Sequence, residues 1–547
     1  MIRLFASIPR RWLLLALLLI LVTTVARALP GPRTIDDAFI TFRYSRNIVE
    51  GQGFVYNAGV PSLGTTTPLF TLLMALISAL TGQQDFQWYA IIVSILADST
   101  TAILLFLLAR RLTAHDWLAL IPGLLWALSP YSVTFAVGGM ETSLNICWML
   151  AAFSLFVLQP PSPRRQMLIG LFAALGFLTR IDSALWIGPL FLAHFIESWL
   201  AGRPAAAPFL RRLPLRTWIT FVVALLPWFA FSAVYFGSPF PRSLSAKTVA
   251  YNMPPGSAFI KFIQTYTTPF VENLTLPSAL LGLLAIIYLV LTLTALLFTA
   301  RRLPRLLPFL LYPWLYMIVF SVANPLIFRW YVAPPLPAFT LGLFIGLFAL
   351  VTGLSARRQS GLMSANLEQF AARPLPAPSA SRLLPIIGLV ALFWGFAALN
   401  AWTLHPDHGA DRPAPQMAWH QIELYYQDIA TQLRDEYDVT PATLVASGDI
   451  GVVGYFSRAT ILDTVGLVTP TVSHYYPIPA SIIPEGQNYA IPPQLILDYD
   501  PAFLVAMESM VRLGLEQSPE FKAEYRLVRD IPTDFYGKGM YLYQRQG

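Results

Sequence analysis

Long runs of apolar residues recur along most of the chain and predict membrane-spanning helices. About 20 apolar residues are needed to cross the hydrocarbon core of a bilayer. A further apolar stretch, 68–80, is shorter and opens with proline, so we expect it in the outer interface. The pattern therefore predicts a mainly α, polytopic transmembrane bundle of about eleven spans. The runs that meet the requirement are 11–29, 88–109, 117–137, 142–158, 167–179, 184–200, 217–236, 277–299, 306–323, 332–353 and 383–403.

The arginines between these runs predict the orientation of the bundle, because cytoplasmic loops of membrane proteins carry an excess of basic residues. With a cytoplasmic N-terminus and eleven spans, every arginine pair falls on the cytoplasmic side, and the chain ends outside. We take the first apolar run as an uncleaved helix. The cytoplasmic arginines are then Arg10, Arg11, Arg110, Arg111, Arg164, Arg165, Arg203, Arg211, Arg212, Arg216, Arg301, Arg302, Arg305, Arg357, Arg358, Arg373 and Arg382.

The composition changes after the last apolar run. Residues 404–547 are polar and contain strand-like runs such as TLVASGD and AFLVAM, separated by turn signals. We therefore expect residues 1–403 to form a transmembrane domain, with an outer loop at 30–87, and residues 404–547 to form an extracytoplasmic α/β domain. The Pro- and Ser-rich segment 354–382 is expected to be a cytoplasmic linker.

Overall composition supports this plasma-membrane interpretation. The chain is 56% hydrophobic and only 12% charged, whereas soluble domains carry about 25% charged residues. The net charge of +7 is spread among loops and does not indicate nucleic-acid binding. A single cysteine, Cys147, leaves no intramolecular disulfide. No phosphate-binding loop or dinucleotide fingerprint is present, which is what a lipid-borne substrate predicts.

Charged residues that are not cytoplasmic converge on the outer membrane boundary. Charge close to a bilayer is costly and is usually functional. Acids and bases together in a partly apolar cleft suit transfer of a group between a lipid phosphate and a hydroxyl. The residues are Asp36, Asp37, Arg43, Arg46, Glu141, Arg180, Asp182, Arg242, Lys247, Lys261, Asn324 and Arg329.

The first outer loop holds the strongest pattern. DDAFITFRYSRNIVEGQGFVYNAG followed by GTTTPL resembles the first outer loop of the GT-C glycosyltransferase superfamily. Within it, the chain is most similar to the terminal arabinofuranosyltransferases of the mycobacterial cell wall and their relatives. GGMETSL at 138–144, LTRID at 178–182, FGSPFPRSLSAK at 236–247 and ASGDIGVVGYFSRATILDTVGL at 446–467 extend the resemblance over nearly the whole chain.

The resemblance implies a polyprenyl-phosphate monosaccharide donor, inversion at the anomeric carbon, and a role in building cell-envelope polysaccharide. The acceptor could be a glycan, a lipid or a protein. Inversion needs one base for the acceptor proton and a pocket that stabilises the departing phosphate. Asp36 matches the first acid of the family's pair and is the expected base. Asp37 would orient it, bind a sugar hydroxyl or help to hold a divalent cation.

The remaining site predictions each have a structural alternative. The expected donor-phosphate ligands are Arg180, Arg329, Lys247 and Arg43, while Glu141 and Asp182 are acceptor or metal candidates. Asp36 or Asp37 could simply cap its helix, and Arg180 could simply pair with Asp182. Glu141 could be an ordinary loop residue, and Arg43 could anchor the helix to lipid. A metal site, if one exists, would use Asp37 and Glu141.

A transporter or flippase of lipid-linked saccharides is the main alternative function. Such a protein would place charges through the depth of the membrane. Asp98 is the mid-span acid that could serve as a proton site, and a hydrogen bond to a neighbouring helix is the alternative. The other spans are nearly free of charge, which favours the glycosyltransferase.

Overall fold

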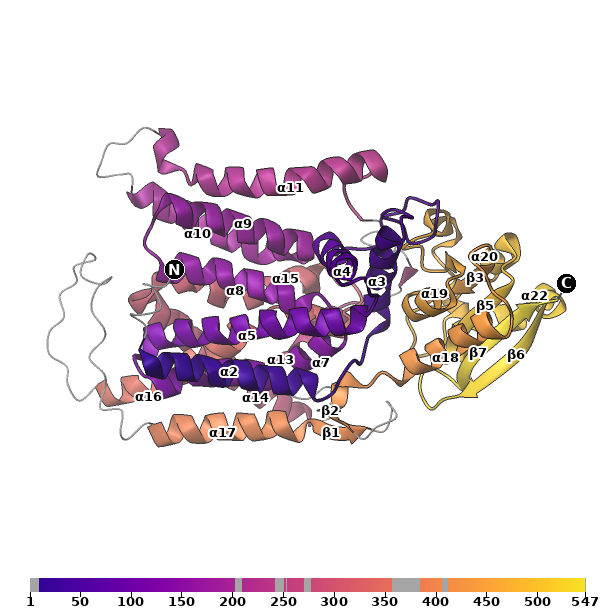
Figure 1. Cartoon of the computed structure of the whole chain (residues 1–547). Helices are drawn as coiled ribbons and strands as arrows, with labels where there is room; N and C mark the ends of the chain where they lie inside the picture. The colour runs from indigo at the N-terminus through magenta and orange to yellow at the C-terminus, as the bar shows by residue number, and fades with distance from the viewer. Residues whose placement is uncertain are drawn as a thin grey trace.

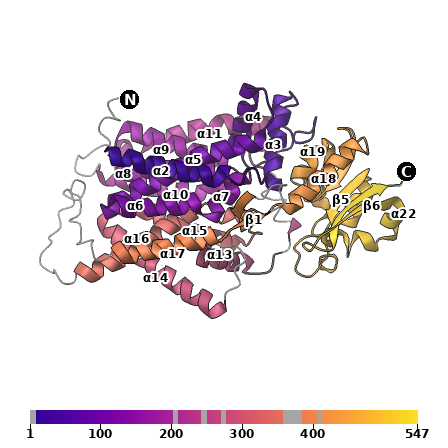
Figure 2. The same ribbon diagram turned by 60° about the horizontal axis from the view of Figure 1, so that its bottom comes forward.

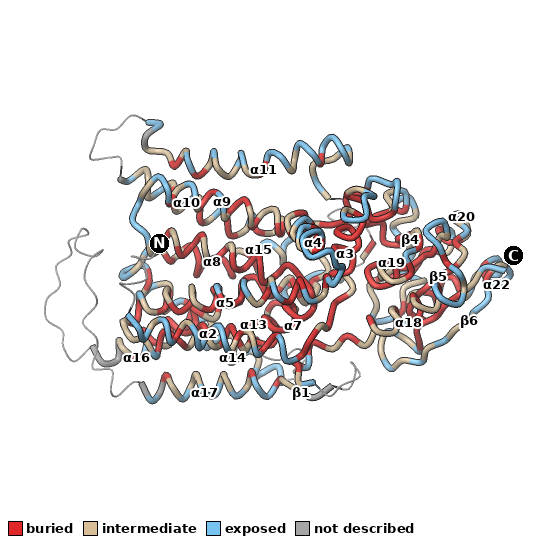
Figure 3. The backbone as a smooth tube through the Cα atoms, in the orientation of Figure 1, coloured by how far each residue is buried: buried red, intermediate tan, exposed pale blue. Residues whose placement is uncertain are grey.

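The protein consists of a helical bundle with a smaller C-terminal domain at one end (Figure 1). The computed structural model describes residues 9–201, 209–241, 250–251, 253–269, 277–356, 384–405 and 412–546. One continuous cluster of buried hydrophobic residues extends from the bundle into the C-terminal domain. Figure 3 shows this buried interior, whereas α11 and α17 expose much of their surface.

A helix covers each of the eleven apolar runs. The bundle helices are α2 (Arg10–Ala28), α5 (Phe86–Thr113), α6 (Asp116–Leu128) with α7 (Pro130–Val137), α8 (Thr142–Leu158), α9 (Pro163–Thr179), α10 (Ala184–Ala201), α11 (Leu215–Tyr235), α14 (Ser278–Arg302), α15 (Leu307–Ala323), α16 (Leu336–Ala356) and α17 (Leu384–Asn400). A shorter helix, α13 (Ser257–Thr267), packs against α14 and α15.

The predicted count of about eleven spans is not confirmed. Among the described residues, five helices are long and apolar enough to cross a membrane, or six if the bent pair α6–α7 is one span. Helices α8, α9 and α17 have 17 residues each. At 1.5 Å per residue such a helix is somewhat shorter than the roughly 30 Å hydrocarbon core. The protein is nevertheless a multi-pass membrane protein by the helices that do qualify.

The break between α6 and α7 positions the loop that carries Glu141. Pro130 begins α7, and a proline disfavours helical conformation in the residue before it. Ser129 accordingly has φ −58° and ψ 127°, and the two helices meet at 44°. Helix α7 then ends in the glycine pair of GGMETSL, where Gly139 has a φ of +75°.

Arginine pairs from different loops meet at one end of the bundle through shared acids. Asp116 at the start of α6 pairs with Arg110 from the end of α5 at 2.5 Å and with Arg11 from the start of α2 at 2.9 Å. Glu197 pairs with Arg165 at 2.9 Å and with Arg305 at 2.6 Å. These contacts agree with the expected grouping of the basic loops; their cytoplasmic placement stays a prediction.

Two short helices of the first outer loop lie across the other end of the bundle. They are α3 (Asp36–Val49) and α4 (Pro68–Thr81). Both run across the direction of the long helices, and α3 lies between the bundle and the C-terminal domain (Figures 1 and 2). The stretch 68–80 thus forms a helix of only 14 residues, among the helices too short to count as a span.

The C-terminal domain is built on a mixed five-stranded sheet with strand order β4-β3-β5-β7-β6. β3 (Leu444–Ser447) runs parallel to β4 (Thr460–Asp463) and β5 (Phe503–Met507). β7 (Gly539–Arg545) is antiparallel to β5 and β6 (Tyr525–Pro532). Its helices are α18 (Gln421–Asp435), α19 (Gly451–Ser457), α20 (Pro493–Tyr499), α21 (Glu508–Val511) and α22 (Pro519–Glu524).

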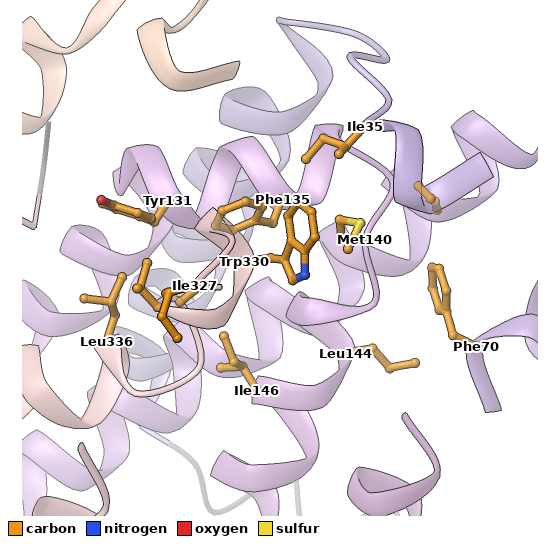
Figure 4. Packing of buried hydrophobic residues seen from close by; sticks show 14 of the residues in the cluster. Ile35, Phe70, Tyr131, Phe135, Met140, Leu144, Ile146, Ile327, Trp330 and Leu336 are labelled. Carbon is orange, nitrogen blue, oxygen red and sulfur yellow. The ribbon is translucent and has the colours of Figure 1, made fainter. Parts of the chain in front are cut away.

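A two-stranded ribbon and three short 3-10 turns matter for the site. Antiparallel β1 (Trp402–His405) and β2 (Arg412–Pro415) connect α17 to the C-terminal domain. The turns are η1 (Ile181–Ser183), η4 (Arg329–Tyr331) and η7 (Gln416–Ala418). Trp330 of η4 packs among the buried hydrophobic residues at this end of the bundle, close to Phe135 and Met140 (Figure 4).

Candidate active site

The acidic start of α3 is docked onto the C-terminal domain. The backbone N–H of Gly451 donates to Oδ2 of Asp36 at 3.0 Å, and that of Val452 donates to Oδ1 at 2.7 Å. These are the first residues of α19. The N-cap position of α3 is Ile35, and Asp36 is the first residue inside the helix. The alternative in which Asp36 caps α3 is therefore wrong: its carboxylate caps α19 instead.

This carboxylate is held in an environment that favours its neutral form. Burial raises the pKa of Asp36 well above its usual range, and the charge of Asp449 raises it further. The two backbone N–H groups act in the opposite direction because they stabilise the ionised form. An acid whose pKa is raised by burial and by neighbouring charges is a recurrent feature of active sites.

Two glycines of α19 allow the C-terminal domain to approach this closely. A Cβ atom at Gly451 would overlap the carbonyl oxygen of Asp36. A Cβ atom at Gly454 would overlap the hydroxyl of Tyr56 and the guanidinium of Arg43. The spacing of three places both glycines on one face of α19. The face of α19 that carries the two glycines of GVVG therefore has no side chains there, and it fits closely against the first outer loop.

Arg43 joins the first outer loop to the C-terminal domain. Its Nε donates to the carbonyl of Tyr56 at 2.8 Å, and its Nη2 donates to Asn57 at 3.2 Å and to the carbonyl of Ala459 at 2.6 Å. The guanidinium also lies 4.1 Å from the centroid of the Tyr56 ring. These contacts give Arg43 a structural role, and its expected contact with donor phosphate stays a prediction.

Four carboxyl groups and one arginine influence one another where α3, α18 and the β3–α19 loop meet. Asp37 and Asp449 both raise the pKa of Asp36. Asp449 accepts a hydrogen bond from the Tyr426 hydroxyl of α18 at 2.8 Å. Burial raises the pKa of Glu423 to about 7, and the positive charge of Arg329 opposes that rise. The cluster formed by these four acids and Arg329 is called the acidic centre below.

Arg329 comes from the bundle and reaches the C-terminal domain. Its Nη1 donates to the carbonyl of Met417 at 2.8 Å, in the turn that precedes α18. Its charge also acts on Glu423. Among the described residues predicted to bind phosphate, Arg329 is the one whose charge affects the pKa of an acid in the acidic centre. Tyr251 also lies near this centre. Burial raises the pKa of its phenol, and the charges of Asp449 and Asp37 raise that pKa further.

A second ionic cluster forms where the loop between α7 and α8 meets the end of α9. Arg180 donates to both oxygens of Asp182, at 3.0 and 2.9 Å, and to Oε1 of Glu141 at 2.7 Å. The hydroxyl of Tyr316 donates to Asp182 at 2.9 Å, and the Tyr331 ring lies 5.4 Å from the guanidinium. Burial raises the pKa of Glu141, and the charge of Arg180 opposes this shift.

This cluster bears on three predictions. The alternative in which Arg180 pairs with Asp182 is what the structure shows. Glu141 is a buried ion-pair partner rather than an exposed loop residue. One guanidinium facing two carboxylates leaves a net negative charge, so a phosphate could approach only if one carboxylate moved away or became protonated. The predicted phosphate contact of Arg180 and the predicted acceptor or metal contacts of Glu141 and Asp182 stay predictions.

Other site predictions can be placed briefly. Lys247 lies outside the described residues. Within the described part of the chain, no group of three or more His, Cys, Asp or Glu residues could hold a metal ion. Asp37 acts on Asp36 and Tyr251, whereas Glu141 pairs with Arg180. The predicted metal site, with Asp37 and Glu141 as ligands, stays a prediction, and no chemical step is assigned to a cation.

Asp98 is fully engaged inside the bundle. It pairs with Arg27 at 2.8 Å and accepts hydrogen bonds from Trp126 at 3.1 Å and Ser143 at 2.8 Å. The predicted hydrogen bond to a neighbouring helix is confirmed. Arg27 also donates to the hydroxyl of Ser132 and to the carbonyl of Ala127. The pair thus ties together α2, α5, α6, α7 and α8, which is a structural role.

Sequence reasoning missed Arg27 and Glu423. Arg27 was not singled out, because nothing near it in the sequence shows that Asp98 is its partner. Glu423 lies in a polar, amphipathic helix segment, QIELYYQD, in which an exposed acid is expected. No local signal separates it from a solvent-facing glutamate.

An apolar pocket opens beside these clusters, where the first outer loop meets α9 and α11. Ile181, one of its walls, is next to Arg180 in the sequence. It is lined by Leu63, Thr65, Thr66, Pro68, Phe177, Leu178, Ile181, Trp228, Phe229, Pro239, Phe240 and Pro241.

Comparison with known families gives two regional matches. Residues 65–231 match the family described as dolichyl-phosphate-mannose-protein mannosyltransferase. Residues 415–544 match a family described as a domain of unknown function. No curated protein sequence matches the chain significantly.

Solved structures match over nearly the whole chain. ArnT from Cupriavidus metallidurans, bound to undecaprenyl phosphate, is 15% identical, with 97% of each chain covered and a TM-score of 0.53. The oligosaccharyltransferase AglB from Archaeoglobus fulgidus, with an inhibitory peptide and a dolichol-phosphate, is 12% identical over 97% of this chain and 74% of that one, with a TM-score of 0.53. AftD from Mycobacteria is 15% identical over 99% of this chain and 40% of that one, with a TM-score of 0.43, which is too low to establish a shared fold.

The fold of the described residues is therefore that of the GT-C membrane glycosyltransferases. The resemblance drawn from the first outer loop is confirmed at the level of this superfamily by the family match and by the structural matches.

Proposed function

We propose that the protein transfers a hexosyl or pentosyl group from a polyprenyl-phosphate donor to an extracytoplasmic acceptor hydroxyl, with inversion at the anomeric carbon. The observation that carries the proposal is the position of Asp36 and Asp37, at the junction of a GT-C bundle and a C-terminal domain, within the acidic centre. ArnT and AglB, which share the fold, were solved with undecaprenyl phosphate and dolichol-phosphate.

The apolar pocket supports a lipid-borne donor. A polyprenyl chain needs an apolar surface that is continuous with the membrane, and its phosphate must reach polar residues at the membrane boundary. The pocket beside α9 and α11 has aromatic walls such as Phe177 and Trp228, and its wall residue Ile181 is next to Arg180 in the sequence. Arg329, whose charge acts on the acidic centre, is the proposed partner of the departing phosphate, because a guanidinium forms strong charge-assisted bonds to phosphate oxygens. Lys247, Arg43 and Arg180 remain further proposed phosphate ligands.

Asp36 is the proposed general base. In a single inverting displacement, the acceptor oxygen attacks the anomeric carbon, its proton passes to the base, and polyprenyl phosphate leaves. A carboxylate with a raised pKa accepts that proton more readily than an ordinary one. The two N–H groups from α19 fix the orientation of the carboxylate and leave lone pairs on both oxygens for the acceptor.

The direct test is incubation of the purified full-length protein with a panel of polyprenyl-phosphate sugars and a cell-envelope fraction, with mass spectrometry of released polyprenyl phosphate. Asp36→Asn should lower single-turnover release by roughly 10²–10⁴-fold, the usual contribution of a general base. Asp435→Asn, on the exposed side of α18, is the matched control. Normal turnover in Asp36→Asn would remove Asp36 as the base.

A folding control is needed because the structure places Asp36 under α19. Asparagine has only one carbonyl oxygen, so it can accept from Gly451 or Val452 but cannot reproduce both bonds. The variant should therefore be compared with wild type for melting temperature and for binding of polyprenyl phosphate. Loss of turnover with binding retained assigns the defect to proton transfer.

A further inference from the structure

Glu423 carries a buried oxygen that has no partner. The residue lies in the first turn of α18 and is only 7% exposed. Its Oε2 atom is inaccessible to solvent and accepts no hydrogen bond from any described residue. A buried carboxylate oxygen left in this state costs considerable free energy unless a ligand or water satisfies it. An unsatisfied acceptor next to an active centre therefore points to a bound group that donates a hydrogen bond.

The neighbours of Glu423 restrict what that group can be. Arg329 from η4 and the backbone N–H of Asp36 from α3 stabilise its charge, and Asp449 from the β3–α19 loop opposes it. With Asp36 and Asp449 close by, an anion would be repelled from Oε2 itself, and the phosphate proposed for Arg329 would bind that guanidinium and not this carboxylate. No three-ligand metal cluster exists among the described residues. A neutral hydroxyl donor fits both restrictions.

Aromatic residues beside the acidic centre suit a sugar ring. Trp330 and Phe328 stack with ring centroids 4.8 Å apart, and Tyr251 contacts Phe328 at 6.0 Å and Tyr489 of the C-terminal domain at 5.9 Å. This aromatic row extends from the bundle to the C-terminal domain, and the phenol of Tyr251 is affected by Asp449. Aromatic faces together with a few polar groups are typical of small-molecule sites.

We infer that Glu423 is an acceptor-binding residue whose free oxygen accepts a hydrogen bond from a hydroxyl of a saccharide acceptor, so that the C-terminal domain supplies part of the acceptor subsite. The inference rests on the proposed function and narrows the acceptor from glycan, lipid or protein to a glycan. It also gives the C-terminal domain a task in the reaction, since α18 presents this residue to the loop that holds the proposed base.

The ionisation of Glu423 should make acceptor binding depend on pH, which a purely structural role of this residue would not do. Its pKa is raised to about 7 by burial, and the ionised carboxylate accepts hydrogen bonds more strongly than the neutral acid. The groups that face it are Arg329, Asp36 and Asp449, with Tyr426 on its own helix. Acceptor binding should therefore tighten as the pH rises through the neutral range.

The first experiment uses whichever donor is productive, with a panel of methyl glycosides as acceptor probes. Glu423→Gln should raise KM for the glycoside by about 10-fold, the difference between a charged and a neutral hydrogen bond. It should also abolish the pH dependence of that KM. Glu436→Gln, an exposed acid at the end of the same helix, is the matched control. An unchanged KM and pH profile in Glu423→Gln would overturn the inference.

The second experiment does not depend on turnover. Dicyclohexylcarbodiimide modifies carboxyl groups that are protonated in apolar surroundings, so it should label Glu423 near neutral pH, with mass spectrometry to locate the adduct. Methyl glycosides should protect against labelling. Absence of labelling, or protection only by a serine or threonine peptide, would overturn the inference. If no donor is productive, the proposed function fails, while protection at Glu423 still reports saccharide binding.

Discussion

Replacing Glu423 by glutamine should stabilise the protein at neutral and higher pH but not in acid. Burial raises the pKa of Glu423 from its ordinary value of 4.5 to about 7. Between these values the folded protein binds a proton that the unfolded chain releases. The stability contribution is therefore fully present below about pH 4.5 and is lost as the pH rises through about 7. Glutamine does not titrate, so the stability of the variant does not fall in this way as the pH rises.

The magnitude follows from the shift. The difference between 7 and 4.5 is 2.5 pKa units, and each unit corresponds to about 1.36 kcal/mol. The pH-dependent contribution of Glu423 to the free energy of unfolding is therefore about 3 kcal/mol. The side chain is 7% exposed, so solvent screening removes little of it. Other acids with raised pKa values, such as Asp463 at about 6, titrate in both proteins and cancel in the comparison.

The assay is unfolding of wild type and Glu423→Gln in detergent, followed by tryptophan fluorescence at several pH values between about 4 and 8, the range that spans both pKa values. The advantage of the variant should grow with pH and level off above about 7. Glu436→Gln should show no such trend, because that residue is exposed. An advantage that is constant with pH, or that shrinks as the pH rises, would refute the reasoning.

Three further predictions test the architecture. Gly451→Ala should loosen the contact of the C-terminal domain with the first outer loop, which would be seen as faster proteolysis and lower turnover. Gly448→Ala should be tolerated, because an added Cβ atom there would lie 3.4 Å from its nearest neighbour. Equal effects of the two substitutions would contradict the close contact at Gly451. Asp98→Asn should destabilise by roughly 3–5 kcal/mol, the cost of an unpaired buried charge, while transfer per folded molecule persists; lost transfer would point to transport. Cysteines at exposed Ala58 and Gln159 should react with an impermeant maleimide from opposite sides of the membrane, and one-sided labelling would contradict the topology.

Hydrophobic pattern alone located the helices of the bundle, because the information for each helix is local. The apolar run at 117–137 was predicted as one helix, and the structure divides it at Ser129, which precedes Pro130. The sequence predicted that Asp98 forms a hydrogen bond to a neighbouring helix, but it did not identify Arg27 as the partner. Arg27 lies 71 residues away in sequence, and only the packing of α2 against α5 brings the two together.

The candidate site was predicted in part for the same reason. The paired acids at the start of α3 were visible because they form a compact pattern in one loop. Their partners were not, since capping was expected within α3 and occurs on α19 instead. Glu423 was invisible because burial, not sequence pattern, changes its chemistry. Contacts between the two domains decide the site, and no local pattern encodes them.

The contact between Asp36 and α19 has a consequence for how the protein is made. The carboxylate and the N–H of Gly451 are separated by 415 residues, so on the ribosome the acid pair is synthesised long before its partner exists. A chain that stops before α19 has the whole helical bundle but lacks both amide groups that orient Asp36. The bundle can thus enter the membrane early, while the finished site arises only after the last domain has folded.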